Sequence, residues 1–250
     1  MRHELRKIYG ALKELHAYYQ DFLILNSQSK SAAREFPFGA LRPCLNERRG
    51  EGGTAKGHYF HQDLLVARRI FRNQPRKHLD IGSRVDGFVA HVASFRDIEV
   101  LDIRPVTAMI PNIRFLQADL MAPMDDNLVD YCDSLSCLHA LEHFGLGRYG
   151  DPIMYDGYLL GLQNIWTILK KHGAAYISVP IGPQRIEFNA HRVFCIEYLL
   201  ECFAPKYEIN TFSFVDDHGD LHEDVPLTAT EVKGNFGCEY GCGIFEMTKT

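Results

Sequence analysis

The stretch His78–Gly87, which reads His-Leu-Asp-Ile-Gly-Ser-Arg-Val-Asp-Gly, constrains the fold of this chain more than any other. Asp80 stands near the end of a short apolar run, Gly82 follows almost at once, and Gly87 opens the next segment. This order predicts a strand, a tight turn and a helix. That is the arrangement with which α/β domains bind nucleotide-like ligands beyond the ends of their strands.

The turn indicates which kind of ligand fits. Dinucleotide sites have the pattern G-x-G-x-x-G, whose central glycine lets the backbone approach a pyrophosphate. Here the frame Gly82–Gly87 carries Arg84 at that position, and Asp86 just before the expected helix would repel a phosphate. The loop therefore disfavours an NAD-dependent oxidoreductase. It favours a ligand with no phosphate and a positive end, such as S-adenosylmethionine.

Composition and charge narrow the class further. The chain has 250 residues and a formal net charge of −5, so it has room for one large α/β domain and lacks the basic field that nucleic acids attract. Seven scattered cysteines, an odd number, indicate a reducing compartment. No run approaches the ~18 apolar residues of a membrane span, and the charged N-terminal segment lacks the apolar core of a signal peptide. We expect a cytoplasmic protein without membrane or nucleic-acid partners.

Two helices are expected ahead of the His78–Gly87 stretch. Apolar residues at three-to-four spacing predict an amphipathic helix over residues 4–25 and a second helix over residues 59–71. A polar linker over residues 26–34 and an exposed, mobile glycine-rich loop around residues 47–53 lie between them. We therefore expect an N-terminal segment, residues 1–58, and a domain over residues 59–250. The first helix could dock on that domain, cap its site or pair with a second subunit.

From residue 77 onward, apolar runs and helical patterns alternate. Strands are expected at residues 77–81, 98–103, 112–116, 134–138 and 174–179, and helices at 87–95, 155–171 and 194–203. The longest of these helices should end at a His172-Gly173 cap, and Pro180 should close the fifth strand. Two β-like runs, residues 207–214 and 243–247, follow. Such alternation predicts a Rossmann-like, doubly wound, mostly parallel seven-stranded sheet with an antiparallel edge hairpin.

Three aspartates stand at the ends of successive expected strands. Asp80 ends the first, and Asp102, 22 residues further on, ends the second, where a carboxylate can accept both hydroxyls of a ribose. Asp119 follows the third, where it could accept from an adenine amino group with Leu120 against the ring. Each aspartate alone fits an ordinary turn or helix cap. Together, in this order, they favour a nucleoside cofactor.

Residues 59–248 resemble a class I S-adenosylmethionine-dependent methyltransferase, of a poorly characterised methyltransferase-like branch. The stretch Cys132–His143 is similar to the superfamily's fourth-strand motif, an acidic residue, an apolar strand and then Leu-Glu-His on a short helix. Asp133 and the run Leu141–His143 match that motif, although Ser134 and Ser136 make the strand more polar than usual.

The first motif of that superfamily, D-x-G-x-G-x-G, is matched only in part. Asp80 and Gly82 match it, Arg84 and Asp86 replace the next two glycines, and Gly87 comes one residue late. The resemblance implies S-adenosylmethionine as cofactor and a hydroxyl or amine of a small polar, carbohydrate-like acceptor as substrate. The residues that would bind the cofactor are Asp80, Gly82, Ser83, Arg84, Gly87, Asp102, Ile103, Asp119, Leu120, Cys137 and Leu138.

Three histidines are candidates for the reaction itself. His139, at the end of the fourth strand, would lie beside the methyl group and is the first candidate for a general base, with His191 on the same rim as the second. His143 would start the wall helix, and a packed or capping histidine is its competing interpretation. The polar loop over residues 148–152 suits either a polar acceptor or an ordinary connection.

Two patterns could indicate a metal. His139–His143 spells H-x-x-E-H, but it follows a strand directly and breaks at Gly145–Gly147 instead of continuing as a long helix. Cys238 and Cys242 lack a second Cys/His pair at zinc-finger spacing. We therefore expect no metal. The altered glycine motif leaves a second function open, a catalytically inactive methyltransferase-like module that binds or scaffolds.

Overall fold

The computed structural model describes residues 2–30, 36, 38–45 and 53–250, which group into two compact units, Met1–Thr54 and Ala55–Thr250. The first unit holds the helix α1, Arg2–Ser29, and the ring of Phe22 meets that of Phe38 edge-on at 5.4 Å between centroids. The linker expected over residues 26–34 is wrong at residues 26–29, and residues 31–34 lie outside the described residues. Residues 26–29 continue the helix, because each added residue gains a backbone hydrogen bond and Ser29 Oγ donates to Asn26 O. Most of the expected mobile loop at residues 47–53 lies outside the described residues.

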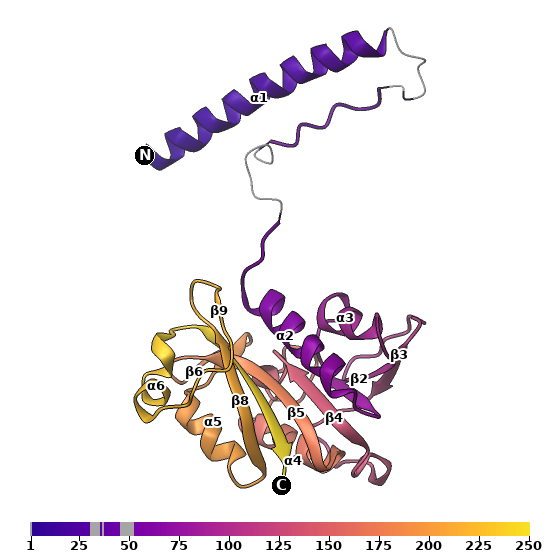
Figure 1. Cartoon of the computed structure of the whole chain (residues 1–250), viewed down its shortest axis with the longest axis vertical. Helices are drawn as coiled ribbons and strands as arrows, with labels where there is room; N and C mark the ends of the chain where they lie inside the picture. Colours follow the sequence, from indigo (N-terminus) through magenta and orange to yellow (C-terminus); the bar gives the residue numbers. More distant parts are fainter. Residues whose placement is uncertain (1, 31–35, 37, 46–52) are drawn as a thin grey trace. The chain divides into compact units, whose positions relative to one another are not determined.

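The second unit is built on an eight-stranded sheet in the order β3-β2-β1-β4-β5-β10-β8-β9 (Figure 1). Its strands are β1 His78–Ile81, β2 Ile98–Asp102, β3 Ile113–Gln117, β4 Cys132–Leu138, β5 Leu169–Ile181, β8 Tyr207–Val215, β9 Leu221–His222 and β10 Gly241–Lys249. The strands β1 to β5 pair in parallel, and β10 runs antiparallel to both β5 and β8. The predicted Rossmann-like sheet with an antiparallel edge is confirmed, with the short β9 as an eighth strand.

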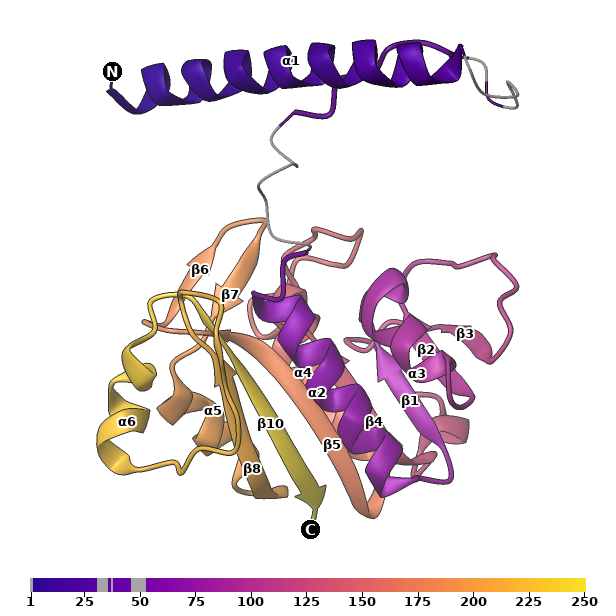
Figure 2. The same ribbon diagram turned by 45° about the horizontal axis from the view of Figure 1, so that its top comes forward.

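Helices cover both faces of this sheet. They are α2 His58–Asn73, η1 Val85–Val89, α3 Ala90–Ala93, η2 Asp126–Leu128, η3 Leu141–His143, α4 Gly157–Ile168, α5 Ile196–Phe203, α6 Ala229–Lys233 and η4 Asn235–Gly237. The apolar sides of α2 and α3 share one core cluster with β2, while α4 and α5 share another with β1 and β5. Figure 2 shows α2 lying along one face. No helix in the described parts of the chain has an apolar stretch long enough to cross a bilayer.

The boundary between α4 and β5 differs from the prediction. The helix ends at Ile168, and β5 begins at Leu169, whose fully buried side chain belongs to the core. His172, with a φ of 63°, turns the chain inside β5, where the pairing shifts from Cys132 opposite Leu169 to Ser134 opposite Ala174. The expected His172-Gly173 helix cap is therefore a strand irregularity. Pro180 does not close β5 either. It lies beyond Ser178, the last residue of β5 that pairs with β4, but it still pairs with Cys242 of β10.

One pair of strands was not predicted. β6 Arg185–Glu187 and β7 His191–Val193 form a separate antiparallel ribbon after β5. Each strand has three residues, too few to show alternation in the sequence. Figure 2 shows this ribbon near the C-terminal end of β5, and Ile181 at that end pairs with Phe194 just after β7.

Candidate functional site

The loop after β1 is held in place by a buried carboxylate. Asp80 accepts hydrogen bonds from Ser83 N at 3.0 Å, from Ser83 Oγ at 2.7 Å and from Ser136 Oγ on β4 at 2.6 Å. Burial raises the pKa of Asp80 to about 6, against the opposing effect of these donors. Gly82 has a φ of 66° and stands so close to Ala140 that an added Cβ would lie 3.0 Å from the Cβ of that residue. Asp80 therefore shapes the loop and does not itself reach a ligand.

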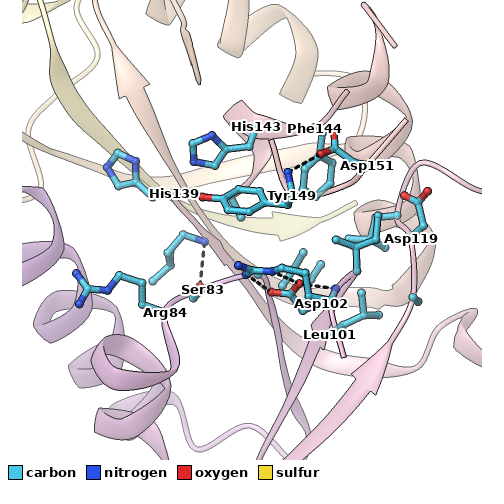
Figure 3. Close-up of a pocket in the computed structure, with 18 of the residues that line it drawn as sticks. Ser83, Arg84, Leu101, Asp102, Asp119, His139, His143, Phe144, Tyr149 and Asp151 are labelled. Atoms are coloured by element: carbon cyan, nitrogen blue, oxygen red, sulfur yellow. Dashed lines mark hydrogen bonds and ion pairs between the residues drawn. The ribbon is translucent and has the colours of Figure 1, made fainter. Parts of the chain in front are cut away.

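A cavity of about 480 Å³ opens where β1, β2 and β4 end. Several lining residues are those that the sequence nominated: Gly82, Ser83, Arg84, Asp102, Ile103, Asp119, Leu120, Leu138, His139 and His143. In Figure 3 the residues that follow β4 lie across the cavity from Ser83, Arg84 and Asp102. Residues from five separate places in the sequence thus surround one space at the ligand-binding edge of an α/β sheet.

Four nominated residues do not line this cavity. They are Asp80, Gly87, Cys137 and His191. Gly87 lies in η1, where an added Cβ would stand 2.6 Å from Asp63 Oδ2. Cys137 is fully buried in β4, and burial raises the pKa of its thiol. The ring of His191 packs against Tyr240, and its Nε2 lies 3.4 Å from Glu187 Oε2.

Asp102, at the end of β2, is held by an arginine that sequence reasoning missed. Its Oδ1 accepts from Arg104 N at 2.8 Å and from Arg104 Nε at 2.9 Å, and its Oδ2 accepts from Arg104 Nη2 at 2.7 Å. The guanidinium also lies 4.5 Å from the centroid of the Tyr149 ring. A vicinal diol at Asp102 therefore has to share or displace Arg104. The signal in the sequence was an arginine two residues after the carboxylate.

Asp119 has the turn role that the sequence allowed for it, and it also lies at the cavity. Its Oδ1 accepts from Met121 N at 2.8 Å, which stabilises the turn after β3, and the residue also lines the cavity. Leu120 beside it is almost fully buried, and its carbonyl accepts from Asn164 Nδ2 at 2.8 Å. This end of the cavity is therefore built by a fixed turn.

His139 follows β4 with a φ of 51° and is paired with a buried carboxylate. Its Nδ1 lies 2.6 Å from Glu142 Oε1, while its buried Nε2 has no hydrogen-bond partner among the residues that the structure describes. Burial by itself would lower the pKa of His139, but Cys242 and the Glu142 carboxylate raise it well above its ordinary value. A pKa raised in this way makes His139 a poor general base.

His143 differs from His139 in that its pKa is lowered. Its Nδ1 lies 2.7 Å from Ala190 O, which can only accept, so Nδ1 carries a proton and Nε2 is the basic nitrogen. Burial lowers the pKa of His143 despite the Glu142 carboxylate, whose Oε1 is 3.7 Å from Nε2. The residue lines the cavity and is neutral near pH 7. The basic Nε2 and the lowered pKa favour His143 as the candidate base, whereas the sequence put His139 first.

The backbone at His139–His143 does not form the long helix that an H-x-x-E-H zinc site needs. The helix η3 spans only Leu141–His143, a single turn, so the two histidines do not share the face of a long helix.

The loop that follows η3 is ordered by Asp151. Its Oδ2 accepts from Gly145 N at 2.8 Å and from Gly147 N at 3.1 Å. Tyr149 and Asp151 thereby become part of the cavity wall.

Comparison with known proteins bears on the fold. The model of a family described as a Caenorhabditis protein of unknown function, DUF268, matches residues 115–232, slightly less than half of the chain. None of the curated proteins matches the sequence. This family match and the absence of curated relatives assign no activity to the chain.

Solved structures are similar over most of the second unit. The [4+2]-cyclase SpnF aligns with a TM-score of 0.54 at 16% identity, over 76% of this chain and 80% of its own. The 1,6-didemethyltoxoflavin-N1-methyltransferase of Burkholderia thailandensis, solved with bound 1,6-didemethyltoxoflavin and S-adenosylhomocysteine, aligns with a TM-score of 0.52 at 16% identity, over 76% of this chain and 78% of its own. At such identity the likeness shows a shared fold, and it confirms the resemblance of residues 59–248 at that level.

Proposed function

We propose that this chain, which has the fold of class I S-adenosylmethionine-dependent methyltransferases, binds S-adenosylmethionine and transfers its methyl group to an oxygen or nitrogen of a small polar acceptor. The observation that carries the proposal is the cavity at the ends of β1, β2 and β4, which brings together the loop, Asp102, Asp119 and the two histidines. One similar structure is a methyltransferase with bound S-adenosylhomocysteine, the demethylated product. Another is a cyclase, so the fold alone does not fix the reaction.

In this proposal each part of the cofactor has a counterpart in the cavity. The adenine lies near Asp119 and Leu120, the ribose hydroxyls meet the Asp102 carboxylate, and the methionine end reaches the Gly82–Arg84 loop. Arg84 then has a use that a glycine would lack, because its guanidinium can pair with the carboxylate of the methionine moiety. Its present partner is the exposed Asp86, at 3.0 Å.

His143 acts as the base when the acceptor is a hydroxyl. Methyl transfer from a sulfonium is an in-line displacement in which the protein mainly aligns the reactants and excludes water. The neutral His143, with Nε2 as its basic nitrogen, takes the acceptor's proton as the oxygen–carbon bond forms. The sulfur leaves with the electron pair of the broken bond, and S-adenosylhomocysteine is the product.

Polar groups on the cavity wall favour a polar acceptor. Tyr149, Asp151 and Arg104 line the cavity, and the Arg104 guanidinium lies 4.5 Å from the centroid of the Tyr149 ring. The guanidinium carbon of Arg148 lies 5.2 Å from the same centroid. Hydroxyl-rich molecules such as sugars can donate to Asp151 and accept from Arg104. This is the support for a carbohydrate-like acceptor.

Calorimetry with S-adenosylmethionine, S-adenosylhomocysteine and NADH tests the proposal. We expect binding of the first two and none of NADH. Asp102→Ala should weaken S-adenosylhomocysteine at least tenfold, because it removes a charge-assisted ribose contact. Asp97→Ala is the matched control, since Asp97 is exposed, lies outside the cavity and carries the same charge. Absence of heat with both sulfur compounds would refute the enzyme and favour the inactive binding module.

A further inference from the structure

A second group of reactive side chains lies at the same edge of the sheet as the cavity. His58 begins α2, His139 follows β4, and Cys242 is the second residue of β10. Their nitrogen and sulfur atoms all lie within 4.8 Å of one another. These residues are far apart in the sequence, so only the fold brings them together.

His139 points a buried nitrogen toward this group. The side chain is 4% exposed, its Nδ1 is paired with Glu142 Oε1, and its Nε2 has no hydrogen-bond partner in the described part of the chain. A buried polar atom without a partner is costly, so it calls for an explanation. Histidines that bind metals through one nitrogen commonly have the other held by a carboxylate, as Glu142 holds this one.

Cys242 supplies the sulfur. It is fully buried, and its Sγ lies 3.7 Å from Gln62 Oε1 and 3.9 Å from Gly243 O. A buried cysteine is usually a small apolar side chain. Here two imidazoles stand beside it, and that neighbourhood suits a thiolate ligand.

We propose that His58, His139 and Cys242 bind one divalent transition-metal ion of the zinc class. Two imidazoles and a thiolate are a donor set that such ions prefer over calcium or magnesium. Three protein ligands leave a fourth position for water or a substrate atom, as in catalytic zinc sites. The proposal replaces the expectation of no metal. His139 belongs to the H-x-x-E-H pattern and Cys242 to the Cys238/Cys242 pair, whereas His58 belongs to neither.

Binding requires a small movement of His58. Tetrahedral zinc with bonds of about 2.0–2.3 Å places its ligand atoms about 3.3–3.7 Å apart. The three ligand atoms now lie within 4.8 Å of one another, so the group has to close by up to about 1.5 Å. The rings of His58 and His139 are stacked at 5.2 Å with 10° between their planes, so the His58 ring turns to share an ion with His139. His58 is the partly exposed member of the group and the first residue of its helix, where such a turn is easiest.

The ion would act on the cavity through Tyr59. This neighbour of His58 lines the cavity, its ring lies 5.1 Å from that of His139, and the Arg84 guanidinium lies 5.1 Å from its ring. An ion on His58 ties the start of α2 to the ends of β4 and β10. It thereby fixes Tyr59 at the end of the cavity where His139 stands.

Titration of the metal-free full chain with Co²⁺ tests the site, because a thiolate bound to Co²⁺ gives a charge-transfer absorption. We expect one equivalent to bind with this absorption and with the strong visible bands of four-coordinate cobalt, and Zn²⁺ to displace it. Cys242→Ser should abolish the charge-transfer absorption, and His58→Ala should weaken Co²⁺ binding at least a hundredfold. Glu142→Gln should weaken it 10–100-fold, roughly the effect of losing a carboxylate behind a metal-binding histidine.

Two matched variants serve as controls. Cys238→Ser alters a second buried cysteine, and His61→Ala alters a second histidine of α2; both should bind Co²⁺ like the parent. Circular dichroism checks folding, and His58→Ala decides the matter where Cys242→Ser does not fold. No charge-transfer absorption in the folded parent, or equal binding by His58→Ala, would overturn the proposal. The test contains no S-adenosylmethionine, so its failure leaves the proposed methyl transfer standing.

Discussion

Burial and hydrogen bonding separate the roles of the aspartates at the strand ends. Asp80 is fully buried, and its carboxylate accepts hydrogen bonds from Ser83 and Ser136. Asp102, in contrast, lies at the cavity in an ion pair with Arg104. The side chain of Asp102 is 12% exposed, enough for a ligand to reach it. The first carboxylate therefore organises the loop, and the second is available for a ligand.

The buried Asp80 makes the stability of the chain depend on pH. Its folded pKa of about 6 lies above its ordinary value of 3.8, so between these values the native state holds a proton that the unfolded state has released. The contribution of this group to stability should therefore fall as pH rises from 4 to 6, by roughly 2 kcal/mol. Asp80→Asn should remove that slope in urea unfolding at pH 4, 5, 6 and 7.

The control for this prediction is Asp133→Asn. The pKa of Asp133 is lowered: burial opposes the shift, but the backbone amides of Arg76 and Lys77 outweigh it. Its stabilising contribution is lost only as pH falls, so this variant should keep the decline between pH 4 and 6. An undiminished decline in Asp80→Asn would contradict the assignment of the proton to Asp80.

His143 should control the rate without controlling cofactor binding. We expect His143→Gln to slow methyl transfer by about 10²–10⁴-fold, the usual contribution of a general base, with an unchanged dissociation constant for S-adenosylmethionine. The pKa of His143 is lowered by burial, so the parent rate should rise with pH and reach half of its maximum below pH 6.5, the ordinary pKa of a histidine. Release of S-adenosylhomocysteine with a panel of sugars and other polar acceptors is the readout.

His191→Gln is the matched control for this variant. His191 does not line the cavity, and its Nε2 lies 3.4 Å from the Glu187 carboxylate. The substitution should therefore leave the rate within about twofold of the parent. Equal losses in both variants, or none in either, would remove His143 from the reaction.

Among the elements, the wall that carries His143 depends on close packing against α4. An added Cβ at Gly161 would lie 2.5 Å from Phe144 Cδ2 and 3.4 Å from Leu141 Cδ1. Phe144 lines the cavity, so the glycine lets α4 approach the wall behind the site. A small residue at this one helical position therefore couples the packing of α4 to the shape of the cavity.

Gly161→Ala should destabilise the chain. Overpacking costs about 1–3 kcal/mol and exceeds the gain of up to about 1 kcal/mol that alanine brings in a helix. We expect a net loss of about 1–2 kcal/mol in urea unfolding. Phe144→Leu should offset part of it in the double variant, since the shorter side chain frees the space. Strictly additive effects of the two substitutions would contradict a direct clash.

The sequence predicted the elements whose residue pattern fits only one kind of secondary structure. It misplaced the boundary between α4 and β5, where the helical pattern runs on into the strand. Amphipathic spacing marked α2, and the apolar run marked β2, close to their observed bounds. Ile168 and Leu169 continue the helical pattern of α4, yet Leu169 is already extended, because the core takes its side chain from a strand. In the site, the strand-end residues were found from spacing. The loop over residues 148–152, which supplies Tyr149 and Asp151 to the cavity, was also recognised. Arg104 and the His58–Cys242 proximity were missed, because they arise from tertiary contacts.

On the scale of the whole second unit, one buried arginine joins its first helix to its last strands. Arg69 on α2 donates to Glu246 of β10 at 2.8 Å and also pairs with Thr211 of β8 and with Asp224. The Arg69 side chain is 8% exposed and that of Glu246 is 18% exposed, so water screens this contact weakly. The network spans the sheet between α2 and the strands beyond β5.

Arg69→Ala should therefore cost much more than the same change next to it. We expect a loss of about 2–4 kcal/mol in the free energy of unfolding, because the substitution leaves the Glu246 carboxylate without its charged partner. Arg68→Ala breaks only the pair with Glu223, whose side chains are 45% and 36% exposed. That loss should stay below about 1 kcal/mol. Similar losses in both variants would show that the Arg69 network adds no special stability.

The central claim is that the cavity at the ends of β1, β2 and β4 binds S-adenosylmethionine. A crystal structure of the chain with S-adenosylhomocysteine tests it most directly. The account predicts density for the nucleoside between Gly82 and Asp119, with the ribose hydroxyls on the Asp102 carboxylate and Arg104 shifted from its present pair. Ligand density elsewhere, or an Asp102–Arg104 pair unchanged beside a bound ribose that Asp102 does not touch, would contradict it.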